Sequence, residues 1–173
     1  MTTAWHETTG PASTVIAVLD SGIDFSHPDL ANGRWVNKDE VAGDNLDDDG
    51  DGYTDDLYGW NWVYGTNDVG DEQRHSTSVA SVIAAEGDNG VGVTGVMGHA
   101  SLMSLKVLDS TGTGDTASAV EALDKDINYP KAVGSLQQVR RRGAPEQFQM
   151  VTRNLEIILS ERSQYSVLFF SSL

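Results

Sequence analysis

The chain has no cysteine among its 173 residues, which excludes disulfide bonds, thiol catalysis and zinc–thiolate sites. Basic side chains are also scarce, because 11 Lys and Arg face 26 Asp and Glu, giving a formal net charge of −15. An acidic surface repels phosphate, so we expect no nucleic-acid partner. No apolar run approaches the ~20 residues of a membrane span. The N-terminal segment has neither the basic start nor the apolar stretch of a signal peptide, so an exported form would need a leader that this sequence does not contain.

Aspartate and glycine are abundant only in the first three quarters of the chain. Residues 1–128 carry 23 acids and 5 bases, whereas residues 129–173 carry 3 acids and 6 bases. One domain rarely changes composition so sharply, so we predict a globular part over 1–128 and a separate, poorly ordered tail over 129–173. The tail is either a natural divergent extension or the product of a shifted reading frame. Within it, only 150–161 and 165–172 have the apolar character of a helix and a strand.

The first part of the chain alternates apolar strands with helical patterns. The predicted elements are strands at 14–19 and 101–108 and helices at 75–86 and 116–126. In the first helix, Val79, Val82 and Ile83 are spaced to share one apolar face. An Asp/Gly-rich loop is predicted over 39–72. This alternation is typical of an α/β fold with a doubly wound, mostly parallel sheet, here incomplete.

Two polar residues stand where a hydrolytic site would need them. Asp20 follows the first predicted strand, and Ser21 and Gly22 after it permit a tight turn; His75 opens the first predicted helix. Taken singly, an acid after a strand is more often a turn or cap residue, and such a histidine is more often structural. Together they are two thirds of a Ser-His-Asp triad, in which the acid orients the histidine and the histidine acts as base.

The sequences around these residues carry a family resemblance. VIAVLDSGIDFSHPDL and HSTSVASVIAAEGDNGVGVTGVMGHASLMSLKVLDSTGTG resemble the aspartate and histidine motifs of the subtilisin-like serine proteases, or subtilases. The resemblance covers roughly residues 4–127 and implies a secreted endopeptidase with polypeptide substrates. It makes Asp20 the orienting acid and His75 the general base and then acid. It also implies a substrate-binding edge that pairs with extended peptide backbone, formed by Ser110, Thr111, Gly112, Thr113 and Gly114.

Two departures from the family pattern bear on activity. Ser76 follows His75 where the family has glycine, and we expect its side chain to shift the imidazole or narrow the cleft. The nucleophile motif Gly-Thr-Ser-x-Ala and the asparagine segment of the oxyanion hole do not occur in this sequence. Ser78 belongs to the histidine motif and is not expected to attack, and the serines of the tail lack a glycine elbow. In subtilisin itself, losing the serine or the histidine costs about 10⁶ in kcat, so we predict that this chain alone is inactive.

The segment DNLDDDGDGYTDD, residues 44–56, places acids at alternate positions between glycines. Calcium takes several oxygen ligands, and glycine lets a loop wrap tightly around it. An EF-hand beginning at Asp47 would need glutamate at position twelve, where Tyr58 stands, so an EF-hand is excluded. A non-helical calcium loop and a solvated acidic turn both remain open. The predicted ligands of the calcium loop are Asp47, Asp49, Asp51 and Asp55.

A second calcium site follows from the resemblance alone. Asp29 and Asn89 match family positions that give side-chain oxygens to a structural calcium, and backbone carbonyls near Val91 and Val93 would complete it.

Taken as a whole, the resemblance implies that this chain is the N-terminal part of a subtilase catalytic domain, whose C-terminal half is the missing partner. The alternative is a catalytically dead, calcium-binding interaction module on the same scaffold.

Overall fold

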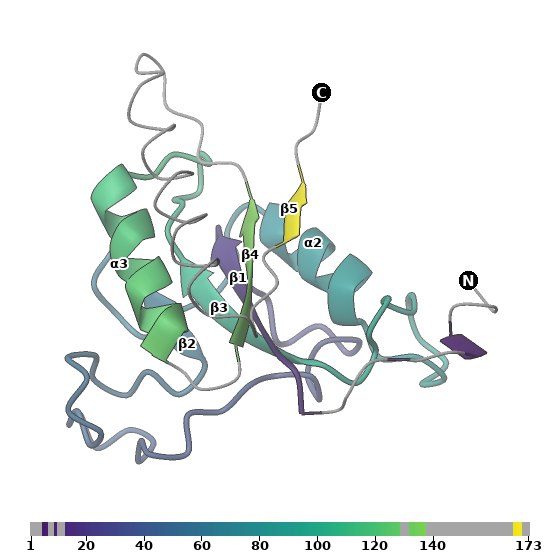
Figure 1. Ribbon diagram of the computed structural model, residues 1–173, viewed down its shortest axis with the longest axis horizontal. Coiled ribbons are helices and arrows are strands. Elements are labelled where there is room, and N and C mark those ends of the chain that lie inside the picture. The colour runs from purple at the N-terminus through teal and green to yellow at the C-terminus, as the bar shows by residue number, and fades with distance from the viewer. Residues whose placement is uncertain (1–4, 7–8, 10–12, 129–131, 138–167, 171–173) are drawn as a thin grey trace.

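The protein is built on one parallel β-sheet, seen in a computed structural model that describes residues 5–6, 9, 13–128, 132–137 and 168–170 (Figure 1). Five strands are ordered β2-β3-β1-β4-β5, and all four pairings are parallel. The elements are β1 (Val15–Asp20), β2 (Gly59–Asn61), α2 (His75–Ala84), β3 (Ser101–Lys106), α3 (Thr116–Asn128), β4 (Ala132–Gln137) and β5 (Leu168–Phe170). The predicted α/β class with a parallel sheet is confirmed.

The strand β1 forms the centre of the sheet. It pairs with β3 on one side, from Val15 opposite Ser101 to Asp20 opposite Lys106, and with β4 on the other. Its side chains alternate between two separate cores, because successive residues of a strand point to opposite faces. Ile16 and Val18 belong to one core, and Ala17 and Leu19 belong to the other. Burial on both faces explains why this strand is apolar without alternation.

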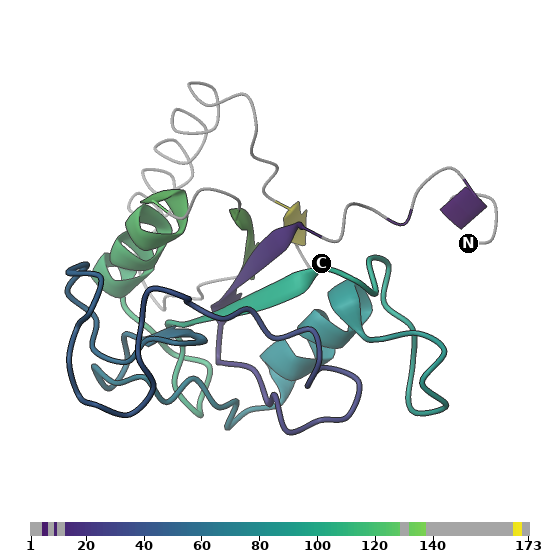
Figure 2. The same cartoon turned by 90° about the horizontal axis from the view of Figure 1, so that it is seen from below.

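The two helices cover opposite faces of the sheet (Figures 1 and 2). Ala80, Ile83 and Ala84 of α2 pack into the core with Ile16 and Val18. Ala122 and Leu123 of α3 pack into the other core. This is the doubly wound arrangement that the alternating pattern predicted.

The prediction of which residues form the apolar face of α2 was partly wrong. Ile83 is buried as expected, but Val82 is 63% exposed. The core stripe instead passes through Ala80, Ile83 and Ala84, which follow the same i, i+3, i+4 spacing one position later. Small alanines at two of these positions let α2 approach the sheet closely.

The element ends differ from expectation by one or two residues, and two strands were not predicted. The strand β3 ends at Lys106, because the Val107 and Leu108 amides both turn to donate to the carbonyl of Asp20. The strand β2 lies inside the predicted loop 39–72, and β4 lies beyond residue 128 and pairs with β1. The strand β5 lies within the predicted range 165–172, whereas the predicted helix 150–161 falls outside the described residues.

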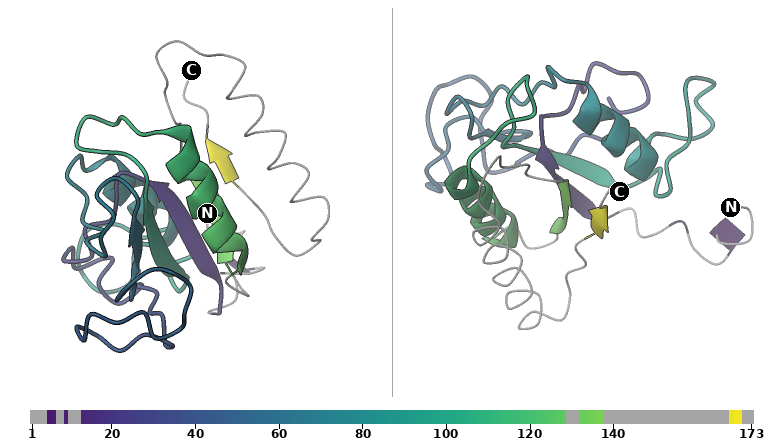
Figure 3. Two further views of the ribbon diagram at one scale, coloured as in Figure 1. Left: turned by 90° about the vertical axis from the view of Figure 1, so that its left-hand side faces the viewer. Right: turned by 90° about the horizontal axis from the view of Figure 1, so that it is seen from above.

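The long connection from β1 to β2 lies at the side of the sheet opposite β5 (Figure 3). This connection carries the Asp/Gly-rich segment of residues 44–56. Within the described part of the chain, neither helix has the length and apolar character needed to cross a membrane.

Candidate active site

Asp20 and His75 lie together, as their positions in the sequence predicted. Asp20 ends β1 and His75 begins α2, and the distance from Asp20 Oδ2 to His75 Nε2 is 3.4 Å. The Ser21 amide donates to Asp20 Oδ1 at 2.6 Å, which holds the carboxylate at the strand end. The following Gly22 has φ of +104°, and a Cβ there would lie 2.5 Å from the carbonyl oxygen of Val69. Only glycine therefore lets the chain turn away from the acid at this point.

The environments of the two side chains are unequal. Asp20 is fully buried, whereas the His75 side chain is 54% exposed. Burial raises the pKa of Asp20, and the Ser21 amide and the nearby His75 only partly oppose that increase. A carboxyl group in such a position suits the orienting member of a triad, because a low-dielectric site strengthens its interaction with a cationic imidazole.

The imidazole of His75 is turned relative to the orientation needed for catalysis. In a Ser-His-Asp triad the acid accepts from Nδ1, so that Nε2 faces the serine. Here Nε2 faces Asp20. The adjacent Ser76, which replaces the family's glycine, is fully buried, and its hydroxyl has no hydrogen-bond partner among the described residues.

Asp71 joins the acid segment to the histidine segment, and sequence reasoning missed it. Its carboxylate accepts the hydroxyl of Ser21 at 2.8 Å, and the amide and hydroxyl of Thr77 at 2.9 and 2.6 Å. It also accepts the amides of Gln73 and Arg74 at the start of α2. Burial alone would raise the pKa of Asp71, but the hydrogen bonds from Thr77, Ser21 and Gln73 outweigh it and lower the pKa. An acid four residues before His75, at the start of a helix with no acid in its first turn, was the available signal.

The predicted substrate edge, residues 110–114, lies beside Gln73 and is folded into a turn. The Asp109 carboxylate accepts the amides of Thr111 and Thr113, and the Asp109 amide donates to the Thr113 carbonyl. The side-chain amide of Gln73 would contact a Cβ on Gly112 at 2.7 Å, which places this turn next to the start of α2. Pairing with an extended peptide would require some of these internal bonds to open.

The Ser78 hydroxyl forms a hydrogen bond at the N-terminal end of its own helix. It donates to the carbonyl of Arg74 at 2.9 Å. This bond agrees with the expectation that Ser78 does not act as nucleophile.

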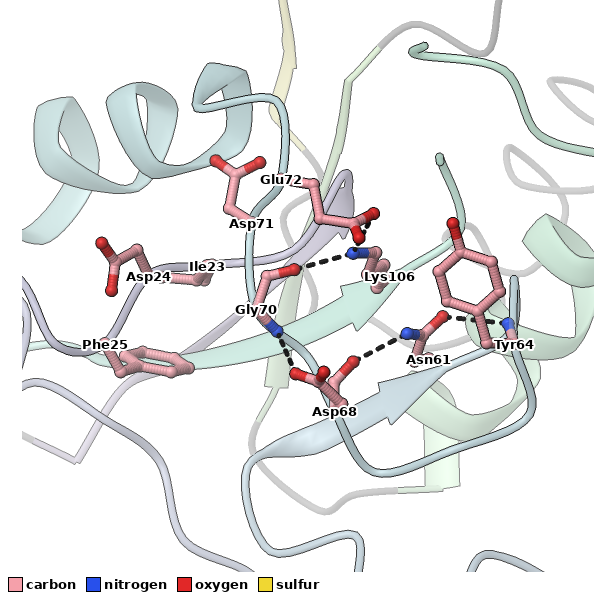
Figure 4. A pocket seen from close by; sticks show the side chains of 10 residues that line it. All are labelled: Ile23, Asp24, Phe25, Asn61, Tyr64, Asp68, Gly70, Asp71, Glu72 and Lys106. Atoms are coloured by element: carbon pink, nitrogen blue, oxygen red, sulfur yellow. Dashed lines mark hydrogen bonds and ion pairs between the residues drawn. The ribbon is translucent and has the colours of Figure 1, made fainter. Parts of the chain in front are cut away.

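A cavity of about 370 Å³ lies beside Asp71, and four carboxylates and one ammonium group line it (Figure 4). Lys106, the β3 residue opposite Asp20, is almost completely buried, and its ammonium donates to the Gly70 carbonyl at 2.7 Å and to Glu72 at 3.2 Å. The charge of Glu72, with some burial, raises the pKa of Tyr64 across the same cavity. The lining residues are Ile23, Asp24, Phe25, Asn61, Tyr64, Asp68, Gly70, Asp71, Glu72 and Lys106.

The four predicted ligands of the Asp/Gly loop do not all converge. Carboxylate oxygens of Asp47, Asp49 and Asp51 lie within 4.8 Å of one another, so this exposed group could hold a metal ion. The Asp55 carboxylate instead accepts the amides of Gly43 and Asn45 at 2.6 and 3.0 Å. A second group of Glu40, Asp49 and Asp56 lies within the same distance.

Lys125 connects this acidic loop to α3. Its ammonium pairs with Asp51 and Asp56 and lies 3.9 Å from the centre of the Tyr53 ring. Burial raises the pKa of Asp56 to about 6, although the hydrogen bonds from Lys125 and Asn37 oppose the shift. Sequence reasoning did not identify Lys125 as a partner of the loop.

The structure gathers the four residues of the second predicted calcium site. The Asp29 carboxylate accepts the Asn89 side-chain amide at 3.1 Å and the Val93 amide at 2.9 Å, and Asn89 Oδ1 accepts the Val91 amide. The bond from Val93, followed by that from Asn89, lowers the pKa of Asp29, which favours a charged carboxylate. The donor set fits a hard cation only in part, because the two side chains already accept these hydrogen bonds.

Sequence comparison identifies relatives of this chain among known proteases. The Subtilase family profile matches residues 12–139. Subtilisin-like protease 1 of Plasmodium vivax is 43% identical over 116 residues, which cover 66% of this chain and 18% of the relative. Halolysin of Haloferax mediterranei is 33% identical over a match that covers 70% of this chain and 20% of halolysin. The cell wall-associated protease of Bacillus subtilis is 39% identical over a match that covers 60% of this chain and 9% of that protease. The chain thus spans about a fifth or less of the length of these relatives.

The fold comparison agrees with the sequence comparison. The crystal structure of a cold adapted subtilisin-like serine proteinase superposes with a TM-score of 0.58 and 16% sequence identity, covering 91% of this chain and 46% of the other. At that identity the likeness concerns the fold. The family profile, the relatives and the acid–histidine contact together show that this chain belongs to the subtilase family of serine proteases.

Proposed function

We propose that this chain supplies the acid and the histidine of a secreted serine endopeptidase that hydrolyses polypeptides. The observation that carries the proposal is the 3.4 Å contact between the buried Asp20 carboxylate and His75. In the reaction, His75 removes the proton of an attacking serine hydroxyl and later gives it to the leaving amine. Asp20 holds the imidazole and stabilises its cationic form.

For this role the His75 ring must turn so that Nδ1 faces Asp20 and Nε2 becomes available to the nucleophile. The exposure of the His75 side chain leaves room for this rotation. Asp71 supports the pair by holding Ser21 and Thr77, which lie next to Asp20 and two residues after His75. The serine and the oxyanion-hole donor would come from the C-terminal half of the catalytic domain, so this chain alone would not hydrolyse peptides.

The proposal includes two structural calcium sites. Asp29 and Asn89, with the carbonyls near Val91 and Val93, would hold one ion, after the amide donors to the two side chains rearrange. Asp47, Asp49 and Asp51 would hold another at the protein surface. Bound calcium would supply positive charge that offsets the repulsion among these carboxylates.

A chimera tests the catalytic proposal. Residues 1–128 would be joined to the C-terminal part of the catalytic domain of Plasmodium vivax subtilisin-like protease 1, which supplies the serine. We expect the chimera to react with a fluorophosphonate and to cleave casein, and His75→Ala to lower kcat by about 10⁶, the loss known from subtilisin itself. An active chimera whose rate is unchanged by His75→Ala would contradict the assignment.

The calcium-binding interaction module is the second candidate function, favoured by the two acidic groups that residues 40–56 form. Fluorophosphonate labelling of the unmodified full chain separates this from an enzyme. Labelling of any serine would show that the chain carries its own nucleophile. The absence of labelling, together with stabilisation by calcium, would support the module or the isolated part of a protease.

A further inference from the structure

The cavity beside Asp71 lies at the edge of the sheet where parallel α/β proteins bind their ligands (Figure 4). Its lining includes Asn61 and Lys106, the last residues of β2 and β3. Its volume of about 370 Å³ falls within the range of ligand pockets, about 300–1,000 Å³. Asp71 accepts the hydroxyl of Ser21 at 2.8 Å, and Ser21 directly follows Asp20. A peptide held at the acid–histidine pair could therefore place a side chain in this cavity.

The lining of the cavity carries more negative than positive charge. Its carboxylates are those of Asp24, Asp68, Asp71 and Glu72, and Lys106 is the one cationic side chain among the lining residues. The Lys106 ammonium pairs with Glu72 at 3.2 Å, and the Lys106 side chain is only 3% exposed. The other three carboxylates form no ion pair within the described part of the chain. This uncompensated charge favours a cationic ligand.

Two of these carboxylates keep one oxygen available for a ligand. Asp24 accepts the amide and the hydroxyl of Ser26 through Oδ1 alone. Asp68 likewise accepts the Gly70 amide through Oδ1 alone. Among the described residues, no group donates to Oδ2 of either side chain. Both Oδ2 atoms can therefore accept hydrogen bonds from a ligand without disturbing the turns that the Oδ1 atoms hold.

The shape of the lining suits a long organic cation better than a metal ion. In the part of the chain that the structure describes, no three of the cavity's carboxylates bring oxygens within 4.8 Å of one another, the spacing at which they could hold a metal. Phe25 and Tyr64 add two aromatic side chains to the lining. Arginine and lysine lay their apolar stems along such surfaces, and their cationic heads are also attracted to aromatic rings.

We propose that this cavity receives an arginine or lysine side chain of the polypeptide substrate, so that the protease prefers peptides with a basic residue near the cleaved bond. This inference rests on the proposed function, because it takes the peptide to lie at Asp20 and His75. Asp24 and Asp68 would bind the cationic head through their Oδ2 atoms, and the two aromatic side chains would contact the stem.

An NMR titration of the full chain tests the cavity without any hydrolysis. The probes are the peptide acetyl-Ala-Arg-Ala-amide and its citrulline counterpart, which keeps the size of arginine but lacks the charge. We expect the arginine peptide to shift the amide signals of Gly70 and Tyr64. It should also bind about fivefold more tightly than the citrulline peptide, as for a partly exposed ion pair. Equal binding of the two peptides would overturn the proposal.

A pair of double variants separates the cavity from the net charge of the chain. Asp24→Asn with Asp68→Asn should abolish the preference for arginine, since each asparagine keeps an acceptor for its amide donor and loses the charge. The control is Asp39→Asn with Asp44→Asn, two exposed acids that do not line the cavity, and it should keep the preference. A preference that persists in the cavity variant, with the spectrum of a folded chain, would also overturn the proposal.

The outcome for the cavity and the outcome for catalysis are distinguishable. Equal binding of the two peptides would leave the catalytic proposal standing, because His75 is tested in the chimera on casein. An active chimera that is insensitive to His75→Ala would contradict the catalytic assignment, whatever the two peptides do.

Discussion

Asp20, the proposed orienting acid, lowers the stability of the folded chain at neutral pH. It is fully buried, and burial raises its pKa above the ordinary value of 3.8. The folded protein therefore binds this proton more tightly than the unfolded chain does. Protonated Asp20 favours folding at low pH, and that contribution is lost as the pH rises from the unfolded pKa through the higher folded pKa.

Asp20→Asn removes the buried negative charge that Asp20 carries at neutral pH. We therefore expect this variant to be more stable at neutral pH by about 1 kcal/mol. The gain should shrink as the pH falls through the raised folded pKa of Asp20, and it should be lost at about pH 4, the ordinary range of an aspartate. Urea unfolding of both proteins between pH 3.5 and 7.5 measures the difference. A gain that is constant over this range, or a loss at pH 7, would contradict the raised pKa.

Asp71 is expected to hold the segments that carry Asp20 and His75 in place. Asp71→Asn replaces one accepting oxygen by an amide that cannot accept hydrogen bonds from Ser21 or Thr77, so we expect a loss of about 2 kcal/mol in the free energy of unfolding. Asp109→Asn is the matched control, because that carboxylate also accepts several donors but stabilises only its own turn. Equal losses in the two variants, measured by urea unfolding, would show that Asp71 has no joining role.

The buried hydroxyl of Ser76 is expected to lower the stability of the folded chain. Its buried hydroxyl has no partner in the described structure, and leaving such a group unsatisfied costs about 1–3 kcal/mol. Ser76→Ala removes the hydroxyl and favours the helix, so we expect an increase of about 1 kcal/mol in stability by thermal unfolding. Ser78→Ala provides a control, because that hydroxyl is bonded to the Arg74 carbonyl on the exposed face. A loss of stability in Ser76→Ala would mean that the hydroxyl is satisfied.

At the residue scale, the sequence was sufficient to predict that Asp20 and His75 meet. The reason is that strand and helix ends at one edge of a parallel sheet are brought together by the fold itself. Ser76 led to the expectation of a shifted imidazole or a narrowed cleft, but not of which ring nitrogen faces Asp20, because the ring rotation depends on packing contacts and not on sequence spacing. Asp71 was missed because its role depends on a contact with Ser21, 50 residues earlier in the chain.

At the element scale, Lys125 is the point at which α3 holds the acidic loop. Its ammonium is almost completely buried and pairs with Asp56, which is itself fully buried. Removing one member of a buried pair leaves the other charge uncompensated and costs about 3–5 kcal/mol. We therefore expect Lys125→Met to destabilise the chain by about 3 kcal/mol in urea unfolding with chelator present.

The double variant Lys125→Met with Asp56→Asn is the control for this prediction. It removes both charges, so its loss should be clearly smaller than that of Lys125→Met alone. If the single and double variants lose the same stability, the pair does not join the loop to the helix.

The long elements were predictable because their patterns repeat over several residues. The strand β1, the strand β3 and both helices were expected within one or two residues of their observed ends. The strand β2 was missed because three residues of an Asp/Gly-rich region carry no pattern, and it forms only by pairing with β3. The strand β4 was placed in a separate tail because composition changes there, although its backbone pairs with β1.

At the scale of the whole molecule, the formal charge of −15 opposes the compact state. Raising ionic strength from 0.01 M to 0.15 M shortens the screening length from about 30 Å to about 8 Å. With chelator present, we expect this change to raise the melting temperature by about 3 °C, equivalent to about 1 kcal/mol for a chain of this size. Choline chloride should act like NaCl, because the effect is screening. A response to NaCl alone would indicate specific cation binding instead.

The central place of β1 also determines which parts of the molecule open first. Its amides are bonded on both sides, to β3 and to β4, and its side chains reach two cores. Hydrogen exchange should therefore be slowest around Ala17 and Val18 and fast in the peripheral loops. Local opening could release the acidic loop or the turn at residues 110–114 while Asp20 keeps its position. The acid is thus anchored to the part of the chain that is expected to exchange most slowly, and the acidic loop and the turn at residues 110–114 can fluctuate around it.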